Sequence, residues 1–356
     1  MNAGKLNRIK YFVGIDLSKL TFNYCIRYDG TNVTNGKSAN NPESIVEFLD
    51  SLHQITGFNF RIAVFGMEVT GIYGNILINA LMARKAKFVV APAIRIKNSL
   101  GIIRGKNDNL DAARIARYLI KNLSELELWT PRRKLIDQLA SLSSLRERMV
   151  KIKKIVKTPI DEDQGFVSPA IAQSNIEFCE PLVFQINTLV DQTDDKIKQL
   201  WTNDERCKRL MEIMLSVTGI GPVTAIQILI HTNEFKSIKD ARSFASYCGV
   251  APFEHQSGTS VKKKSHVSPF ANRRIKSLLH NGVRACIAYD HEIKAYYQRK
   301  VLEDKKNKMS VMNAIKFKLI CRIFACVKAD RLYNRAMLVN NTEAETSMPS
   351  IDKSSH

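Results

Sequence analysis

The chain lacks any long apolar run, any closely paired cysteines and any N-terminal hydrophobic segment. No run approaches the roughly 18–20 apolar residues that span a bilayer, so we expect no membrane partner. Residues 1–10 have no apolar core like that of a signal peptide, which favours a cytoplasmic protein. The 7 cysteines are scattered without a C-x-x-C pair, so the sequence predicts reduced thiols and no zinc site.

Positive charge, by contrast, is in excess. The chain has 54 Lys and Arg against 34 Asp and Glu, a formal net charge of +20. Residues 258–329 alone carry 17 basic and 4 acidic side chains. Such a surface favours a polyanion. Since no basic amphipathic terminal helix or lipidation motif indicates a membrane, the polyanion expected is nucleic acid.

The apolar pattern of the first 125 residues predicts an α/β sheet of mixed direction. We expect strands at 11–18, 22–28, 32–37, 60–67 and 87–91. We expect helices from Pro42 to about Ile55, from Gly71 to Arg84 and from Asn109 to Asn122. Asp29-Gly30 is a strong hairpin signal. Three strands followed by alternating helices and strands is the order of a ribonuclease-H-like domain.

The remainder of the chain is predicted to be mostly helical. A break near 158–165 separates two long amphipathic helices, the second from Pro181 to Trp201, which would pair with each other or with another subunit. The Gly-rich turn in 217–225 is typical of helix-hairpin-helix modules, whose backbone N–H groups face phosphates, although an ordinary turn between helices is the alternative. We therefore expect four parts: an α/β domain at 1–128, a helical linker region at 129–206, a C-terminal domain at 207–335 and a disordered tail at 336–356.

Four carboxylates stand out on this basic chain. Asp16 and Glu68 follow apolar, strand-like runs, while Asp108 and Asp111 lie three residues apart on a predicted helix. Acids at the ends of buried strands cost free energy unless a cation or hydrogen bonds compensate them. Any one of them alone is equally consistent with a cap, a turn or a salt bridge. Lys106, just before the helical pair, is either a phosphate contact or a solvated lysine.

Taken together, the four acids suit a magnesium site that cleaves nucleic acid. Ligands in α/β sheets gather at the carboxyl ends of strands, and acids at i and i+3 share one helical face. Mg²⁺ prefers oxygen ligands. Two such ions roughly 3.5–4 Å apart can activate a nucleophile and stabilise a leaving group in phosphodiester cleavage. The sequence therefore predicts that Asp16, Glu68, Asp108 and Asp111 bind two Mg²⁺ ions.

The motifs around these acids resemble the transposases of insertion-sequence-110 type, the DEDD recombinases. The matching motifs are G-I-D-L-S-K around Asp16, G-M-E-V-T-G around Glu68 and K-N-D-N-L-D-A-x-x-I-A around Asp108 and Asp111. In the second half, V-T-G-I-G-P-V-T-A at 217–225 and F-A-S-Y-C-G-V-A-P at 244–252 match as well. The resemblance covers roughly 11–125 and 205–330. It implies a RuvC-like, ribonuclease-H-fold N-terminal domain and a C-terminal domain that carries a catalytic serine.

The resemblance also implies the chemistry. Ser257 would attack a DNA phosphate and form a covalent phosphoserine link beside the Mg²⁺ held by the four acids. Ser260 is the neighbouring competitor, and His255 is a candidate base. After the serine the family often shows Lys-x-Gly-Asn; here Asn272 aligns, but Ala271 replaces the glycine, which puts the geometry of that loop in question.

Family elements encode a structured noncoding RNA that pairs with donor and target DNA, so the resemblance implies a guide RNA as a partner. The basic excess is compatible with a protein that leaves sequence reading to RNA and contacts backbones. Candidate phosphate contacts are Lys262, Lys263, Lys264, Arg273, Arg274 and Lys276, each of which alone is typically a solvated charge. Strand exchange needs at least two active sites, so we expect a dimer, and a tetramer on DNA, associated with the nucleoid when active.

Two other functions remain open from the sequence. A RuvC-type, structure-specific nuclease would use the four acids and water without the serine. A nucleic-acid-binding protein with a degenerate site is the third reading, and the presence of all four acids argues against it.

Overall fold

The computed structural model describes residues 8–100, 108–162, 165–251, 253–257, 261–266 and 271–334. For 108–109, 253–257 and 261–266 it describes the backbone only. The chain forms two compact units, Met1–Pro131 and Arg132–His356. The predicted tail at 336–356 lies outside the described residues, as do Lys106 and Ser260.

The first unit is built on a five-stranded mixed sheet with the order β3-β2-β1-β4-β5. Its strands are β1 (Tyr11–Leu17), β2 (Thr21–Tyr28), β3 (Thr31–Ala39), β4 (Ala63–Glu68) and β5 (Lys87–Ala91). The first three strands are antiparallel neighbours, whereas β4 runs parallel to both β1 and β5. The expected turn joins β2 to β3, with Asp29 and Gly30 both at positive φ. This confirms the prediction of an α/β domain with a mixed sheet.

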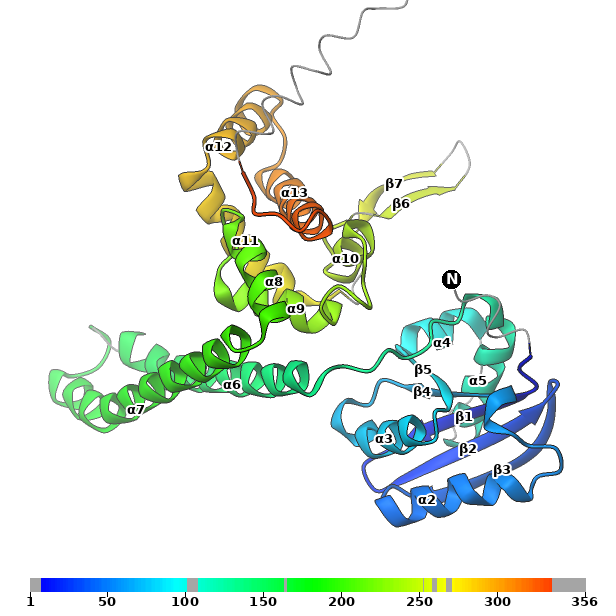
Figure 1. Ribbon diagram of the computed structural model, residues 1–356. Coiled ribbons are helices and arrows are strands. Elements are labelled where there is room, and N and C mark those ends of the chain that lie inside the picture. The colour runs from blue at the N-terminus through cyan, green and yellow to red at the C-terminus, as the bar shows by residue number, and fades with distance from the viewer. Residues whose placement is uncertain are drawn as a thin grey trace, which may run out of the picture. The chain divides into compact units, whose positions relative to one another are not determined.

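Helices cover both faces of this sheet (Figure 1). One face carries α2 (Pro42–Ser51) and α3 (Asn75–Ala83), and the short helices η1 (Leu52–Gln54) and η3 (Gly71–Gly74) account for the rest of the two predicted ranges. The other face carries α4 (Ala93–Leu100) and α5 (Asp108–Lys121), followed by η4 (Leu123–Glu125). Helix α4 was not predicted from the sequence. The predicted start of the fourth strand at Phe60 is wrong, because the Asn59 side chain caps the 3₁₀ turn η2 (Phe60–Ile62) and β4 begins at Ala63.

Strand alternation separates the two cores. Val13 and Ile15 of β1 and Phe65 and Met67 of β4 enter the core shared with α2 and α3. The intervening positions therefore face α5. Consistent with this, Phe12 and Val64 pack with residues of α5 and β5.

The second unit is mostly helical, as predicted. It contains α6 (Lys134–Glu162), α7 (Pro169–Thr202), α8 (Glu205–Ser216), α9 (Pro222–Thr232), α10 (Ala241–Tyr247), α11 (Arg273–Tyr289), α12 (His291–Gln298), η5 (Arg299–Glu303) and α13 (Lys308–Lys328). A two-stranded antiparallel hairpin, β6 (Phe253–Ser257) and β7 (Val261–His266), lies between α10 and α11 and was not predicted. Together, α6 and α7 form the expected helical pair.

The helix boundaries predicted in this unit were right only in part. The break expected near 158–165 is present, but it begins only after Glu162, because α6 includes Pro159. Similarly, α7 begins at Pro169 and runs through Pro181, which had been taken as its first residue. A proline inside a helix loses one backbone hydrogen bond but does not prevent a helix when the flanking residues favour one.

A partly buried ionic network centred on Glu234 lies at the start of α6. The Arg133 guanidinium donates to both Asp204 oxygens at 2.7 and 2.8 Å and to both Glu234 oxygens at 2.6 and 3.0 Å. Glu234 belongs to a run of three left-handed residues, 233–235, that follows α9. Lys236 and Arg206 also pair with Glu234, whose side chain has no exposed surface. This network, defined as Arg133, Asp204 and Glu234, joins the beginning of α6 to α8 and α9.

None of the described helices is long and apolar enough to cross a membrane.

Candidate active site

Asp16 and Glu68 lie side by side at the carboxyl ends of two adjacent parallel strands. Ile15 of β1 pairs with Met67 of β4, so the next position along each strand is Asp16 and Glu68. Both acids occupy the alternating positions that face α5, and both are partly buried. The sheet register alone therefore brings together two of the four predicted acids.

Helix α5 brings the third acid to the same face. Its backbone lies so close to β1 that a Cβ atom on Gly14 would collide with the backbone oxygen of Ala112 and the backbone nitrogen of Ala116. A glycine at this position is therefore what permits the close approach. Asp111, next to Ala112 in the first turn of α5, consequently lies near the ends of the two strands. Asp108 is the first residue of the same helix, and its side chain is outside the described part.

The electrostatics of this face reflect the crowded acids. Burial raises the pKa of Glu68, and the nearby charge of Asp111 raises it further. Asp111 is ion-paired with Arg114, one turn along α5. Among residues with described side chains, no three His, Cys, Asp or Glu stand close enough together to hold a metal ion. The structure thus brings Glu68 and Asp111 within electrostatic reach, while the fourth acid of the predicted set lies outside what is described.

The predicted serine lies in the other unit. Ser257 is the last residue of β6 and pairs with Val261 across the hairpin, so the loop expected around it is in part a strand. Lys262 and Lys263 lie on β7 opposite Gln256 and His255, and Lys264 follows them. The hairpin therefore places three of the candidate phosphate-binding lysines on the strand next to Ser257.

The three remaining basic candidates lie in the first turn of α11. Arg273 is exposed, and Lys276 is partly exposed. Arg274 instead packs toward α6, where its guanidinium is ion-paired with Glu147 and donates to the Ser143 backbone oxygen at 3.4 Å. Their predicted contacts with phosphate stay predictions.

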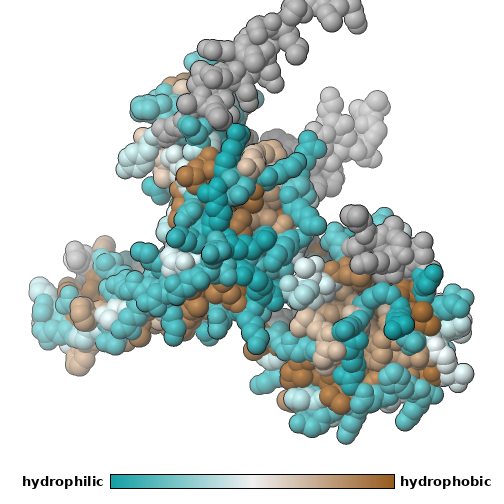
Figure 2. All heavy atoms as spheres, viewed as in Figure 1, coloured by the Kyte–Doolittle hydropathy of each residue, from teal (hydrophilic) through white to brown (hydrophobic). Residues whose placement is uncertain are grey.

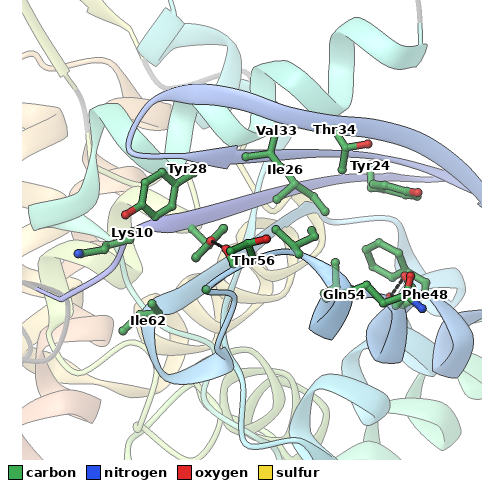
Figure 3. A pocket seen from close by; sticks show the side chains of 15 residues that line it. Lys10, Tyr24, Ile26, Tyr28, Val33, Thr34, Phe48, Gln54, Thr56 and Ile62 are labelled. Carbon is green, nitrogen blue, oxygen red and sulfur yellow. Dashed lines mark hydrogen bonds between the residues drawn. The ribbon is translucent and has the colours of Figure 1, made fainter.

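A cavity of about 730 Å³ lies on the opposite face of the first unit's sheet (Figure 3). Its lining includes Tyr24, Ile26 and Tyr28 of β2, Phe48 of α2 and Lys10 at one end. Tyr24 and Phe48 pack with their ring centroids 4.5 Å apart. None of the four predicted acids lines this cavity, so it is separate from the candidate active site.

One group of residues in the second unit was not predicted from the sequence. His231, Tyr247 and Asn272 contact one another at the point where the hairpin leaves and rejoins the helices. Tyr247 lies within the F-A-S-Y-C-G-V-A-P motif at 244–252, and Asn272 matches the asparagine of the family's Lys-x-Gly-Asn segment. No spacing in the sequence connects either residue to His231.

Comparison with known proteins identifies the family. Residues 13–159 match the DEDD transposase model of the IS110 type, and residues 211–298 match the model described as the transposase IS116/IS110/IS902 family. Pilin gene-inverting proteins of Moraxella bovis and Moraxella lacunata are each 26% identical to this chain over 331 residues, which are 92% of this chain and 98% of theirs. An uncharacterized protein of insertion element IS110 from Streptomyces coelicolor is 27% identical over 128 residues, covering 36% of this chain and 31% of that protein. The two models match both halves of the sequence in order, and the chain belongs to the IS110 family of enzymes, which are transposases and site-specific DNA recombinases.

Proposed function

We propose that this enzyme moves an insertion sequence by cutting and rejoining DNA through a covalent link to Ser257. The observation that carries the proposal is the placement of Asp16 and Glu68 on neighbouring strand ends, with Asp111 close enough to raise the Glu68 pKa. The sheet order β3-β2-β1-β4-β5 with α5 across β1 supports a ribonuclease-H-like, RuvC-like assignment for this unit. The same arrangement in a DNA recombinase indicates phosphoryl transfer.

The acidic face fits a hard divalent cation. All its donors are carboxylate oxygens, and the repulsion that raises the Glu68 pKa is what a cation would relieve. Asp16, Glu68, Asp108 and Asp111 would hold Mg²⁺, in the two-ion form that the four acids suggest. When bound, Mg²⁺ would neutralise phosphate charge and lower the pKa of the attacking hydroxyl. Arg114 contacts only the Oδ1 of Asp111, so Oδ2 would be the oxygen that Asp111 offers to the ion.

The serine step would be a transesterification. The Ser257 Oγ forms a bond to phosphorus as the bond from phosphorus to one deoxyribose oxygen breaks, and the serine proton ends on that leaving oxygen. The reverse reaction, with a hydroxyl of another strand as the attacking group, releases Ser257 and joins the new ends. Because each step exchanges one phosphodiester for another, no external energy source is required.

Guidance by a structured noncoding RNA is the part of the proposal that rests on family membership and charge. The net charge of +20 and the lysines on β7 suit two nucleic acids held by their backbones. Sequencing the nucleic acid that co-purifies with the protein tests this part. A discrete RNA transcribed from DNA beside the gene is expected, and its absence would count against guidance.

Self-association is proposed for the helical pair α6 and α7. Large apolar side chains are exposed along it, including Ile155 at 72%, Phe178 at 83% and Phe184 at 69%. Figure 2 shows hydrophobic residues interrupting the hydrophilic surface of this pair. Exposed apolar surface of this kind marks a protein interface. Changing Phe178 and Phe184 to Lys should shift the protein toward monomer in light scattering, whereas Lys153→Glu, a charge change on the same pair, should leave its mass unchanged.

The decisive experiment is Ser257→Ala. We expect the variant to lose both DNA rearrangement and the covalent protein–DNA adduct seen on denaturing gels, while Ser260→Ala keeps both. If Ser257→Ala still cuts DNA at the wild-type rate and Asp16→Asn does not, the protein is a nuclease that uses water. If Ser260→Ala alone loses the adduct, the nucleophile is Ser260.

A further inference from the structure

Three helix ends meet where the segment that carries Ser257 leaves and rejoins the second unit. His231 lies in the last turn of α9, Tyr247 ends α10 and Asn272 is the N-cap of α11. The backbone N–H of Asn272 donates to the Tyr247 carbonyl at 2.9 Å, which ties the two ends of the segment together. Figure 1 shows β6 and β7 extending from this side of α10. We call these three residues the root cluster.

The hydrogen bonds of the root cluster determine its proton positions. The Asn272 Oδ1 accepts from the Ile275 backbone N–H at 3.1 Å, so its Nδ2 is the donor on the other side. That Nδ2 lies 3.4 Å from the His231 Nε2 and 3.2 Å from the Tyr247 hydroxyl. An N–H on Nε2 would place two donors against each other, so Nε2 carries the lone pair and accepts.

It follows that the His231 hydrogen is on Nδ1. Burial, together with the charges of Arg132 and Arg274, lowers the pKa of His231 to about 4, so the ring is neutral at pH 7 and has a single N–H. Nδ1 lies 2.8 Å from the Tyr247 hydroxyl and donates to it. The hydroxyl oxygen thus accepts from both His231 and Asn272, and its own hydrogen points away from the cluster.

The surroundings of this hydroxyl favour an anionic acceptor. Tyr247 is 38% exposed, and no residue with a described side chain accepts its hydrogen. Two donors into its oxygen polarise the O–H group, which makes it a stronger donor. Burial of its inner side raises the pKa of Tyr247, so the group is a neutral donor rather than a phenolate. Arg132 and Arg274 supply positive charge nearby, although Arg274 shares its charge with Glu147.

We infer that Tyr247 binds a nucleic-acid phosphate oxygen through its hydroxyl, and that His231 and Asn272 position this hydroxyl. The contact lies at the root of the segment that bears Ser257, so it would fix a backbone phosphate at a set place relative to that segment. The inference rests on the proposed function for its ligand, because only a protein that binds nucleic acid presents this phosphate.

Tyr247→Phe tests the contact and keeps the ring that packs on Phe244. Binding is measured by fluorescence anisotropy in EDTA, so that no cleavage occurs, with a random-sequence DNA duplex and with a hairpin RNA. We expect the affinity for at least one probe to be about tenfold to a hundredfold weaker, because the variant loses one hydrogen bond to a charged group. A loss with DNA alone assigns the phosphate to DNA, and a loss with RNA alone assigns it to RNA. Tyr28→Phe, at a tyrosine with a similar 40% exposure in the first unit, should bind both as the wild type does.

Salt dependence separates this contact from a charged one. A neutral donor releases no counterion of its own, so Tyr247→Phe should weaken binding equally at all salt concentrations. Unchanged affinity for both probes, or a shallower salt slope, would overturn the inference.

A double-mutant cycle tests the positioning role. His231→Leu should weaken binding in the wild type and have no further effect in the Tyr247→Phe background, because His231 acts through the hydroxyl. Additive losses would show that His231 acts independently and would overturn the positioning role. Thermal unfolding of each variant identifies any loss that comes from misfolding, and Tyr247→Phe, which keeps the ring, is expected to match the wild type.

The test of the Tyr247 contact can fail independently of the test of the proposed function. If Ser257→Ala loses the adduct while Tyr247→Phe binds as the wild type does, only the inference fails. If the wild type binds neither probe, both fail together.

Discussion

The two units place their proposed catalytic groups by different means. In the first unit, Asp16 and Glu68 are held by neighbouring strands in the middle of a five-stranded sheet, with α5 packed directly against Gly14. In the second unit, Ser257 ends one strand of a hairpin whose segment is tied at its root by Asn272 and Tyr247. A two-stranded sheet is marginal by itself, whereas a packed mixed sheet fixes its side chains firmly. The predicted acids are therefore held by a packed sheet and helix, whereas the position of Ser257 depends on its hairpin.

The largest effect is expected from replacing one of the predicted metal-binding acids of the first unit. Asp16→Asn keeps the size of the side chain but removes the charge that would bind Mg²⁺, so DNA rearrangement should fall by a factor on the order of 10³ or more. The measurement is the yield of recombinant junctions by quantitative PCR. Asp29→Asn is the matched control, because Asp29 sits at positive φ in the β2–β3 turn, where Asn is equally suited. Rearrangement that survives in Asp16→Asn would contradict the metal site.

The next effect tests how the second unit is held together. Arg133→Met removes the guanidinium from buried Glu234 but leaves its ion pairs with Lys236 and Arg206, so it should cost about 1.5–3 kcal/mol. Urea unfolding of the full chain should show the second unit destabilised and the first unchanged. Arg209→Met removes an ion pair with Asp330 that is 44% and 74% exposed, so it should cost about 0–1 kcal/mol. Equal effects of the two variants would mean that the buried network has no special role.

The same network predicts the response of the second unit to acid. Hydrogen bonds from Arg133 lower the pKa of Asp204. Burial by itself would raise the pKa of Glu234, but its hydrogen bonds with Arg133 and Lys236 are stronger, so the pKa of Glu234 is also lowered. A carboxyl whose pKa is lower in the folded state than in the unfolded state stabilises the fold at pH values above its unfolded pKa of about 4. This stability is lost as the pH falls through the folded pKa. Unfolding free energy of the second unit should therefore decline below about pH 4. This decline should be shallower in Asp204→Asn, and an unchanged slope in that variant would argue against the network as its source.

A smaller effect is expected from the contact that brings α5 to the acids. Gly14→Ala forces the α5 backbone away from β1, because the new Cβ would meet backbone atoms of Ala112 and Ala116 that have no room to yield. Overpacking of this kind costs about 1–3 kcal/mol. Gly30→Ala is the control: it sits at φ +88° with nothing within 4 Å, so it costs about 1 kcal/mol from backbone strain alone. Because Asp111 moves with α5, the DNA rearrangement activity of the Gly14→Ala variant should fall by more than its loss of folding stability accounts for.

The sequence predicted the first unit better than the second, for a physical reason. Period-two alternation and the Asp29-Gly30 turn are local signals, and they located the strands and the acids of the sheet to within a few residues. The contact at Gly14 joins residues about 100 positions apart and leaves no periodic signal. In the second unit, Pro159 and Pro181 indicated helix ends, but both helices continue through these prolines, and the β6–β7 hairpin was missed because its strands carry mostly polar side chains. The root cluster depends on three helix ends meeting, which no single segment of the sequence encodes.

The smallest expected effect distinguishes two adjacent arginines of the second unit. Arg273 is exposed at the start of α11, so Arg273→Ala should weaken DNA binding about twofold to threefold and reduce the slope of log K against log salt by about 1, with an unchanged melting temperature. Arg274 is 28% exposed and ion-paired with Glu147 of α6, so Arg274→Ala should lower stability by about 1 kcal/mol and change the salt slope less. Both are measured by anisotropy titrations over a salt series and by thermal melts. If Arg274→Ala gives the larger change in slope, the Glu147 pair must open when nucleic acid binds, and the contact between α11 and α6 would be part of the binding surface rather than only of the scaffold.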